Sequence, residues 1–344
     1  MSVIADPLPA WVYESKQGPV IGAVTLFSVL AIAAVILRFK CRLLVRAGLA
    51  IDDWLILAAL PVALAEAICV AYTTKDTLGR HIQVVSAPAL LEGGKMFFTI
   101  QILWIISSAI VKLSILAFYL RVFSILDYIR FSAWFLIVMV TCWLIGSTVA
   151  HGLQCQPVAK IWQDSLPGHC LDTESLFLIG SIADVVMDFL ILALPLPAII
   201  RLQMPLSRKL ELVVIFALGG LTCVLSLVRF LEAKDSIYDR SDITWKSWFP
   251  LIWGVAEPCL GTLCACLPIL QPLMQGLKEG VTKLSSSATT FIPNNNKNFN
   301  GAQHSWKPKL SHRDRGVEIP TSSEVNLQEV PSSRHWDSEA SCVI

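Results

Sequence analysis

Charged residues are scarce in this chain. Only 15% of its 344 residues are Asp, Glu, Lys or Arg, against about 25% in ordinary soluble domains, and 55% are hydrophobic. The formal net charge is +1, and Lys and Arg do not gather on any one segment. The sequence therefore lacks the basic field that a nucleic-acid partner requires. These shortages argue against a soluble domain and against nucleic-acid binding, and they favour a protein whose partner is the lipid bilayer.

Two further features are missing at the ends of the chain. The first eighteen residues lack the basic region and the small-residue cleavage site of a signal peptide, so we expect the first apolar run to stay as a membrane anchor. Residues 1–18 then form an extracellular N-terminus. Residues 272–344 lack long apolar runs and are rich in Ser, Asn, Pro and charge. Such a segment cannot offset its ordering entropy, which predicts a disordered cytoplasmic tail.

Long apolar segments are what the sequence has in abundance. A membrane-spanning helix needs about 20 predominantly apolar residues. Seven segments meet this requirement: Pro19–Leu37, Trp54–Tyr72, Met96–Leu120, Phe131–Gly152, Leu176–Ile200, Leu210–Leu231 and Trp248–Gln271. We therefore predict an all-α fold, a seven-transmembrane helix bundle over residues 19–271 with a disordered C-terminal tail.

The orientation of the bundle follows from its loops. Lys and Arg are denser after the first, third and fifth predicted helices, among them Arg38, Arg42 and Arg121. Positively charged loops stay in the cytoplasm, which puts the N-terminus outside. The loop holding Cys155 and Cys170 then lies on the oxidising side, and these are the only cysteines in the predicted outer loops. We predict a disulfide between them, with two free thiols as the alternative.

Ionisable residues inside the predicted spans are candidates for function, because a charge in the bilayer is costly and usually faces the bundle interior. They are Glu66, Lys112, Asp184, Asp188, Glu257 and, near the outer end of its helix, Arg229. The first five are the candidates for a ligand pocket. Asp184 and Asp188 share one helix face, and the Lys112 stem can reach that depth. Two interpretations stay open, namely structural pairing that holds the bundle together and a ligand-binding or switching site.

Several motifs along the membrane domain match one known family. They are Asp52-Asp53-Trp54; Gly79-Arg80-His81; Lys112-Leu113-Ser114; Phe118-Tyr119-Leu120-Arg121; Cys155-Gln156-Pro157 with Trp162 and His169-Cys170; Asp184 and Asp188; and Glu257 with Cys264-Ala265-Cys266-Leu267-Pro268. In this order and spacing they resemble the fungal rhodopsin-domain family of seven-helix integral membrane proteins. The resemblance implies receptor-like proteins or members encoded in secondary-metabolite clusters.

The resemblance does not imply a chromophore. Retinal needs a Lys amine for its Schiff base, and the last predicted span has no Lys. We expect no cofactor. His81, His151 and His169 fall near the outer surface but do not have the spacing of a zinc motif, so we expect no metal site and consider an enzyme the less favoured class.

Two functions remain as hypotheses. The first is receptor-like sensing, in the manner of a G-protein-coupled receptor but without retinal, at the plasma membrane, with a cytoplasmic signalling partner reached through loops and tail. The alternative is an accessory membrane protein or enzyme of a secondary-metabolite (mycotoxin) biosynthetic pathway. A transporter is disfavoured, because no inverted repeat is visible.

Overall fold

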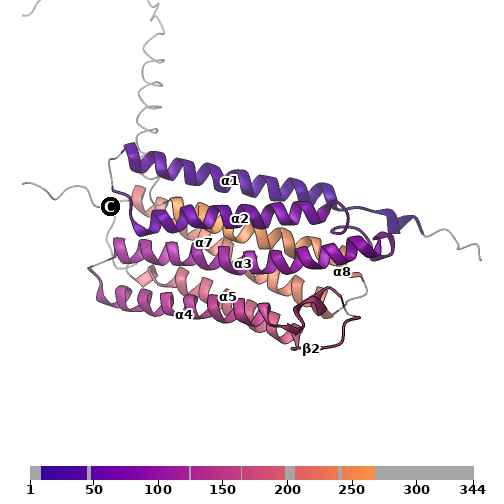
Figure 1. Cartoon of the computed structure of the whole chain (residues 1–344). Helices are drawn as coiled ribbons and strands as arrows, with labels where there is room; N and C mark the ends of the chain where they lie inside the picture. The colour runs from indigo at the N-terminus through magenta and orange to yellow at the C-terminus, as the bar shows by residue number, and fades with distance from the viewer. Residues whose placement is uncertain are drawn as a thin grey trace, which may run out of the picture. The chain divides into compact units, whose positions relative to one another are not determined.

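The computed structural model describes residues 9–44, 48–123, 125–163, 165–197, 206–238 and 242–267. Long helices lying side by side dominate it (Figure 1). They are α1 (Gln17–Leu44), α2 (Ile51–Thr74), α3 (Ala87–Val122), α4 (Asp127–Gly152), α5 (Thr173–Ala193) and α7 (Leu206–Tyr238). The short α8 (Ile243–Lys246) opens a last helix that runs over Ile243–Leu267.

Six helices within the described residues are long and apolar enough to cross a membrane: α1, α2, α3, α4, α5 and the last helix. The remaining predicted span falls on α7, which has 33 residues but whose side chains over 206–216 lie outside the described part. Pro268 and the predicted tail, residues 272–344, also lie outside it. The described chain is thus a multi-pass helical membrane domain.

Local sequence signals explain where several helices begin. The Ser86 hydroxyl accepts a hydrogen bond from the Ala89 N–H at the start of α3, and a proline occupies the first turn. The carboxylate of Asp53 accepts from the Ala50 N–H at the start of α2. The Asp172 carboxylate accepts from two backbone N–H groups at the start of α5. Each acceptor satisfies N–H groups that a helix leaves unpaired.

The apolar core has one part between α1, α2, α3 and the last helix and another between α3, α4 and α5. Val255 and Cys259 of the last helix pack with Val24 and Ala67 in one buried cluster. The outward faces are also apolar, as on α4, where Phe131, Trp134, Phe135 and Val138 are exposed. Apolar side chains on both the inner and outer faces are what a bilayer requires of a helix.

A short hairpin follows α4. Strands β1 (Cys155–Gln156) and β2 (His169–Cys170) pair antiparallel, and Cys155 lies directly opposite Cys170. The two residues form a disulfide, which confirms the prediction. Trp162, just after η3 (Val158–Ile161), packs on α3: a Cβ added to Gly94 would lie 2.9 Å from Trp162 Cβ. The loop therefore lies against the end of α3 that precedes the predicted span.

Three segments far apart in sequence meet at the same end of the bundle. We call their meeting place the outer cap, after the side on which the sequence predicts it. Gly79 adopts φ +77°, its N–H donates to the Thr244 carbonyl, and its own carbonyl accepts from the Lys16 N–H. His81, just before η2 (Ile82–Val84), stacks on Trp245 at 4.0 Å between ring centroids and hydrogen-bonds Asp242. The Gly79-Arg80-His81 motif thus joins the chain before α1 to the chain before the last helix.

Two predicted boundaries need correction. We expected Arg38 and Arg42 in a loop after residue 37, but α1 continues to Leu44 and both residues are buried in it. Asp52 and Asp53 supply the counter-charges that allow this burial. We also expected the third span to begin at Met96, whereas α3 begins at Ala87. Its 36 residues rise about 54 Å, well beyond a hydrocarbon core of about 30 Å.

Candidate functional site

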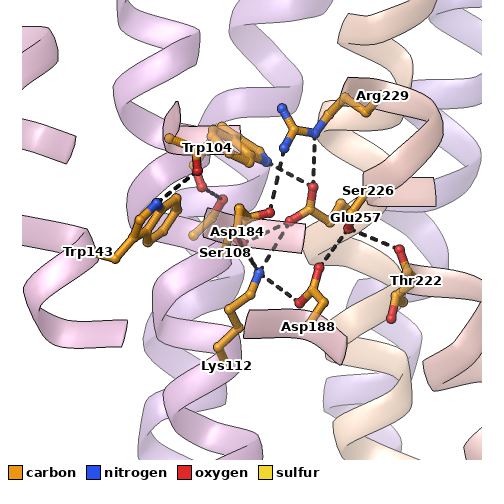
Figure 2. A network of polar contacts seen from close by, with 12 residues as sticks. Trp104, Ser108, Lys112, Trp143, Asp184, Asp188, Thr222, Ser226, Arg229 and Glu257 are labelled. Carbon is orange, nitrogen blue, oxygen red and sulfur yellow. Dashed lines mark hydrogen bonds and ion pairs between the residues drawn. The ribbon is translucent and has the colours of Figure 1, made fainter. Parts of the chain in front are cut away.

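Lys112 lies at the centre of a buried ionic cluster formed by four helices (Figure 2). Its Nζ is 2.9 Å from Asp184 Oδ1 and 2.9 Å from Asp188 Oδ1, both on α5, and 3.5 Å from Glu257 Oε1 on the last helix. It also donates to Ser108 Oγ at 2.7 Å, one turn earlier on α3. The expected pairing of Lys112 with a carboxylate is therefore present, and it involves three carboxyl groups.

Arg229 of α7 is the second cation of this cluster. Its Nε donates to Glu257 Oε2 at 3.1 Å, and its Nη2 is 3.5 Å from Asp184 Oδ2. The guanidinium lies 3.8 Å from the centre of the Trp104 ring, which itself donates to Glu257 Oε2 at 3.3 Å. A guanidinium over an indole face is attracted by the ring quadrupole, most strongly where water is absent.

Glu66 extends the cluster to α2. It is fully buried, and its Oε2 lies 3.1 Å from Ser107 Oγ of α3. Its Oε1 has no hydrogen-bond partner among the described residues and faces the last helix, where a Cβ added to Gly254 would be 3.7 Å away. All five predicted pocket residues, on α2, α3, α5 and the last helix, thus contribute to one polar interior.

Close helix packing brings these side chains together. Gly261, one turn after Glu257, faces α3 so closely that a Cβ there would lie 2.8 Å from Val111 Cγ1, beside Lys112. Asp184 and Asp188 are one turn apart on α5, so both reach the same ammonium group. Removing Lys112 would leave these carboxylates buried without their shared cation.

A small cavity lies beside the cluster. Its lining residues come from α3, α4 and α5 and are Gln101, Trp104, Ile105, Trp143, Ser147, His151, Phe177, Gly180 and Ser181. It offers about 10 Å³ to the centre of a water molecule, which is room for about one water. Trp104 separates it from Arg229 and Glu257, and meets Trp143 edge to face at 5.9 Å. Trp104 therefore contacts both the cavity and the ionic cluster.

A second ionic cluster occupies the opposite end of α1 from the outer cap. Arg38 is 1% exposed and donates to Asp53 Oδ1 at 2.8 Å and to Asp52 Oδ2 at 2.6 Å. Arg42 contacts the same two carboxylates, and Arg121 of α3 approaches Asp52 at 3.5 Å. The family-motif residues Asp52, Asp53 and Arg121 thus meet here.

Sequence reasoning missed several members of these clusters. Arg229 was named among the ionisable residues of the spans but left out of the predicted pocket, and its contacts place it beside Glu257 and Asp184. Arg229 lies three residues after Ser226, on the same face of α7, and this polar spacing predicts that its side chain faces the bundle interior. Trp104 gave no such signal, because an indole in an apolar run is typical of lipid-facing and of core positions alike.

The histidines that were weighed as zinc ligands lie in different surroundings. His81 belongs to the outer cap, His151 lies at the end of α4 beside the small cavity, and His169 is exposed on β2. Among the described residues, the group with metal-ligating spacing is Asp184, Asp188 and Glu257, whose oxygens lie within 4.8 Å of one another. Lys112 Nζ already fills the space between these three carboxyl groups.

Comparison with known proteins adds relatives from fungi. The chain is 27% identical over 188 residues to "Satratoxin biosynthesis SC1 cluster protein 4" of Stachybotrys chartarum, covering 54% of this chain and 67% of that protein. It is 32% identical over 217 residues to a "SAT4 family membrane protein" of Emericella nidulans, covering 61% and 54%. It is 25% identical over 258 residues to "Receptor GIN3" of Arthrobotrys oligospora, covering 72% and 60%.

No solved structure matches the chain significantly. The family model described as the fungal rhodopsin domain matches residues 37–276. That range holds both ionic clusters and all the motif residues named from the sequence. The chain belongs to the fungal rhodopsin domain family.

Proposed function

We propose that this protein is a receptor-like membrane protein of seven spans that senses an external cue without retinal. In this proposal α7 is the span that brings the count to seven, the N-terminus and outer cap lie outside, and the tail lies in the cytoplasm. The membrane that holds the bundle is the plasma membrane. A cytoplasmic partner would read the state of the loops and tail. The printed name of the relative GIN3, a receptor, supports the same class.

The observation that carries the proposal is the Lys112 cluster. Four helices share it, and each supplies a charged group, namely Lys112, Asp184 with Asp188, Arg229 and Glu257. A displacement of any one helix would change the ion pairs of the others, which is what the proposed switch between two states requires. The small cavity behind Trp104 gives a water molecule a place beside this cluster.

The topology part is tested with tags. A tag before residue 9 should be accessible from outside intact cells, and a tag on the tail should be accessible only after the plasma membrane is permeabilised. Protease protection that puts both tags on one side would rule out an odd number of spans and with it this orientation.

The signalling part is tested in a strain that lacks the protein. We expect the wild-type chain to restore the transcriptional response to external cues. Asp184→Asn, which removes a charge paired with Lys112 and Arg229, should alter that response at matched protein abundance. The control is Glu92→Gln, which removes an exposed pair with Lys95 and should restore the response fully. Equal responses of deletion strain and wild type to every cue would contradict a receptor.

A second function is favoured by the relatives. The printed names of several, including the satratoxin cluster protein, place them in biosynthetic clusters. An accessory role or an enzymatic role in a secondary-metabolite pathway predicts a changed product profile in the deletion strain, with a normal transcriptional response. The two proposals are therefore separated by measuring products and transcripts in the same strain.

A further inference from the structure

The buried carboxyl groups outnumber the buried cations around Lys112. Among the described residues, the only cations near the four carboxyl groups are Lys112 and Arg229. The four groups are Glu66, Asp184, Asp188 and Glu257. With every carboxyl group ionised, the cluster would carry two uncompensated negative charges. Burying an unpaired carboxylate away from water costs more free energy than protonating it at ordinary pH. The hydrogen bonds indicate which two carboxyl groups are protonated.

Asp184 and Glu257 are held as carboxylates. Glu257 receives Arg229 Nε and Trp104 Nε1 on one oxygen, and Ser108 Oγ on the other. Asp184 receives Lys112 Nζ on Oδ1, and its Oδ2, which has no hydrogen bond among the described residues, lies 3.5 Å from Arg229 Nη2. Both oxygens of each group therefore face donors or cations, and the two charges match those of Lys112 and Arg229.

Glu66 is different, because its partner Ser107 has too few hydrogens. Ser107 Oγ lies 3.1 Å from Glu66 Oε2 and also 3.1 Å from the Trp104 carbonyl. A hydroxyl has one hydrogen to donate, and a carbonyl and a carboxylate can only accept. Both contacts are satisfied when Ser107 donates to the Trp104 carbonyl and a protonated Glu66 donates to Ser107.

Asp188 has the same arrangement on α5 and α7 (Figure 2). Ser226 Oγ lies 2.7 Å from Asp188 Oδ2 and 3.0 Å from the Thr222 carbonyl. Again there is one hydrogen for two acceptors. A protonated Asp188 donates from Oδ2 to Ser226, while its Oδ1 accepts from Lys112 Nζ.

We infer that this cluster is a two-proton binding site, with one proton on Glu66 Oε2 and one on Asp188 Oδ2. The two protons that supply the missing donors to Ser107 and Ser226 are also the number that cancels the excess negative charge. A metal ion would meet the same excess of charge, but Lys112 Nζ stands between the three carboxyl groups that would ligate it. The inference does not depend on the proposed receptor role.

The two protons link the conformation of the bundle to pH. A conformation that separates these helices and admits water would ionise both acids, so it binds two protons fewer. The described conformation is then favoured as pH falls, and the hydrated one as pH rises. The other titratable or charged groups near the two acids are Lys112, Arg229 and the carboxylates of Asp184 and Glu257. The thiols of Cys69 and Cys259 lie beside Glu66, and that of Cys223 lies beside Asp188.

Infrared spectroscopy of the full-length protein in detergent at neutral pH tests the inference. A protonated carboxyl group has a C=O stretching band that is distinct from carboxylate and amide bands, and exposed acids are ionised at this pH. We expect two such bands, both shifted in D₂O. Glu66→Gln should remove one, Asp188→Asn the other, and the double variant both. A wild-type spectrum without such bands, or bands that persist unchanged in the double variant, would overturn the inference.

Thermal unfolding supplies an independent measure that does not require assigning bands. In Glu66→Gln and in Asp188→Asn the new amide group would keep an N–H donor for the serine, so each variant should hold the melting temperature within about 2 °C. Asp184→Asn and Glu257→Gln, which remove real charges, should each lower it by roughly 5 to 10 °C. Equal losses for all four variants would show that Glu66 and Asp188 are ionised.

Discussion

The Nη1 of Arg38 donates to the carbonyl oxygen of Ala265 at 2.6 Å, although the two residues are 227 positions apart. Ala265 lies near the end of the described part of the last helix. The same guanidinium binds Asp52 and Asp53 at the start of α2. One side chain of α1 therefore connects the start of α2 to the end of the last helix.

Neutralising Arg38 should destabilise the bundle strongly. Arg38→Gln leaves two buried carboxylates with only Arg42 and the more exposed Arg121 nearby, and leaves the Ala265 carbonyl without its donor. We expect the free energy of unfolding to fall by about 3 to 5 kcal/mol, as on breaking one side of a buried pair. Thermal unfolding in detergent measures it. Arg130→Gln, which removes an exposed pair with Asp127, is the control and should change little.

Lys112 should show a loss that a second substitution partly reverses. Lys112→Met leaves Asp184 and Asp188 without their shared cation, which should lower stability by about 3 to 5 kcal/mol. Adding Asp184→Asn removes the carboxylate charge that Lys112 had paired, so the double variant should recover part of the loss. Unfolding of the four proteins of the cycle gives the coupling. Additive losses would show that the two charges do not interact.

The disulfide should stabilise the outer hairpin. Cys155 and Cys170 are 15 positions apart, and a loop of this length gains about 3 kcal/mol from the cross-link in the chain-entropy account. Cys155→Ser with Cys170→Ser should lose that amount and expose Trp162, which can be followed by its fluorescence. Cys142→Ser, at an exposed free thiol, is the matched control. Alkylation of both thiols in unreduced wild-type protein would contradict the bridge.

The start of α5 should respond to acid. The pKa of Asp172 is lowered first by the hydrogen bond from the Ser175 hydroxyl and then by the N–H groups of Ser175 and Glu174. A lowered pKa means that the carboxylate stabilises the fold above the unfolded pKa of about 3.9, and that this stabilisation is lost as pH falls through the folded pKa. Asp172→Asn keeps a cap without titrating. The melting temperature of wild type relative to this variant should therefore fall with acid, and a constant difference would exclude the effect.

The sequence predicted the apolar helices and the disulfide, because both depend on local information. Length and hydropathy identify a span, and only two cysteines stood in the outer loops. The six spans confirm the helical class, and the pairing of Lys112 follows from the shortage of cations among buried carboxyl groups. These conclusions need no knowledge of which helices are neighbours.

The positions of Arg38 and Trp104 could not be predicted in the same way. Arg38 follows an apolar run and reads as the first residue of a basic loop. It becomes helical and buried only because Asp52, Asp53 and the Ala265 carbonyl come together around it. Trp104 acquires its role from Arg229, which lies on a different helix. Contacts between distant segments fix both residues, and hydropathy does not record such contacts.

The position of Lys112 has a consequence for how the chain is made. The ribosome delivers α3 before α5, and Asp184 emerges 72 residues after Lys112. During that interval Lys112 has no carboxylate of α5 to pair with, and a lone charge in hydrocarbon is costly. Its ammonium group therefore stays at the insertion machinery or at the edge of the bilayer. Insertion of α3 should therefore be completed only when α5 arrives. Pulse–chase labelling should show faster degradation of a chain that stops at residue 165 than of one that stops at residue 197.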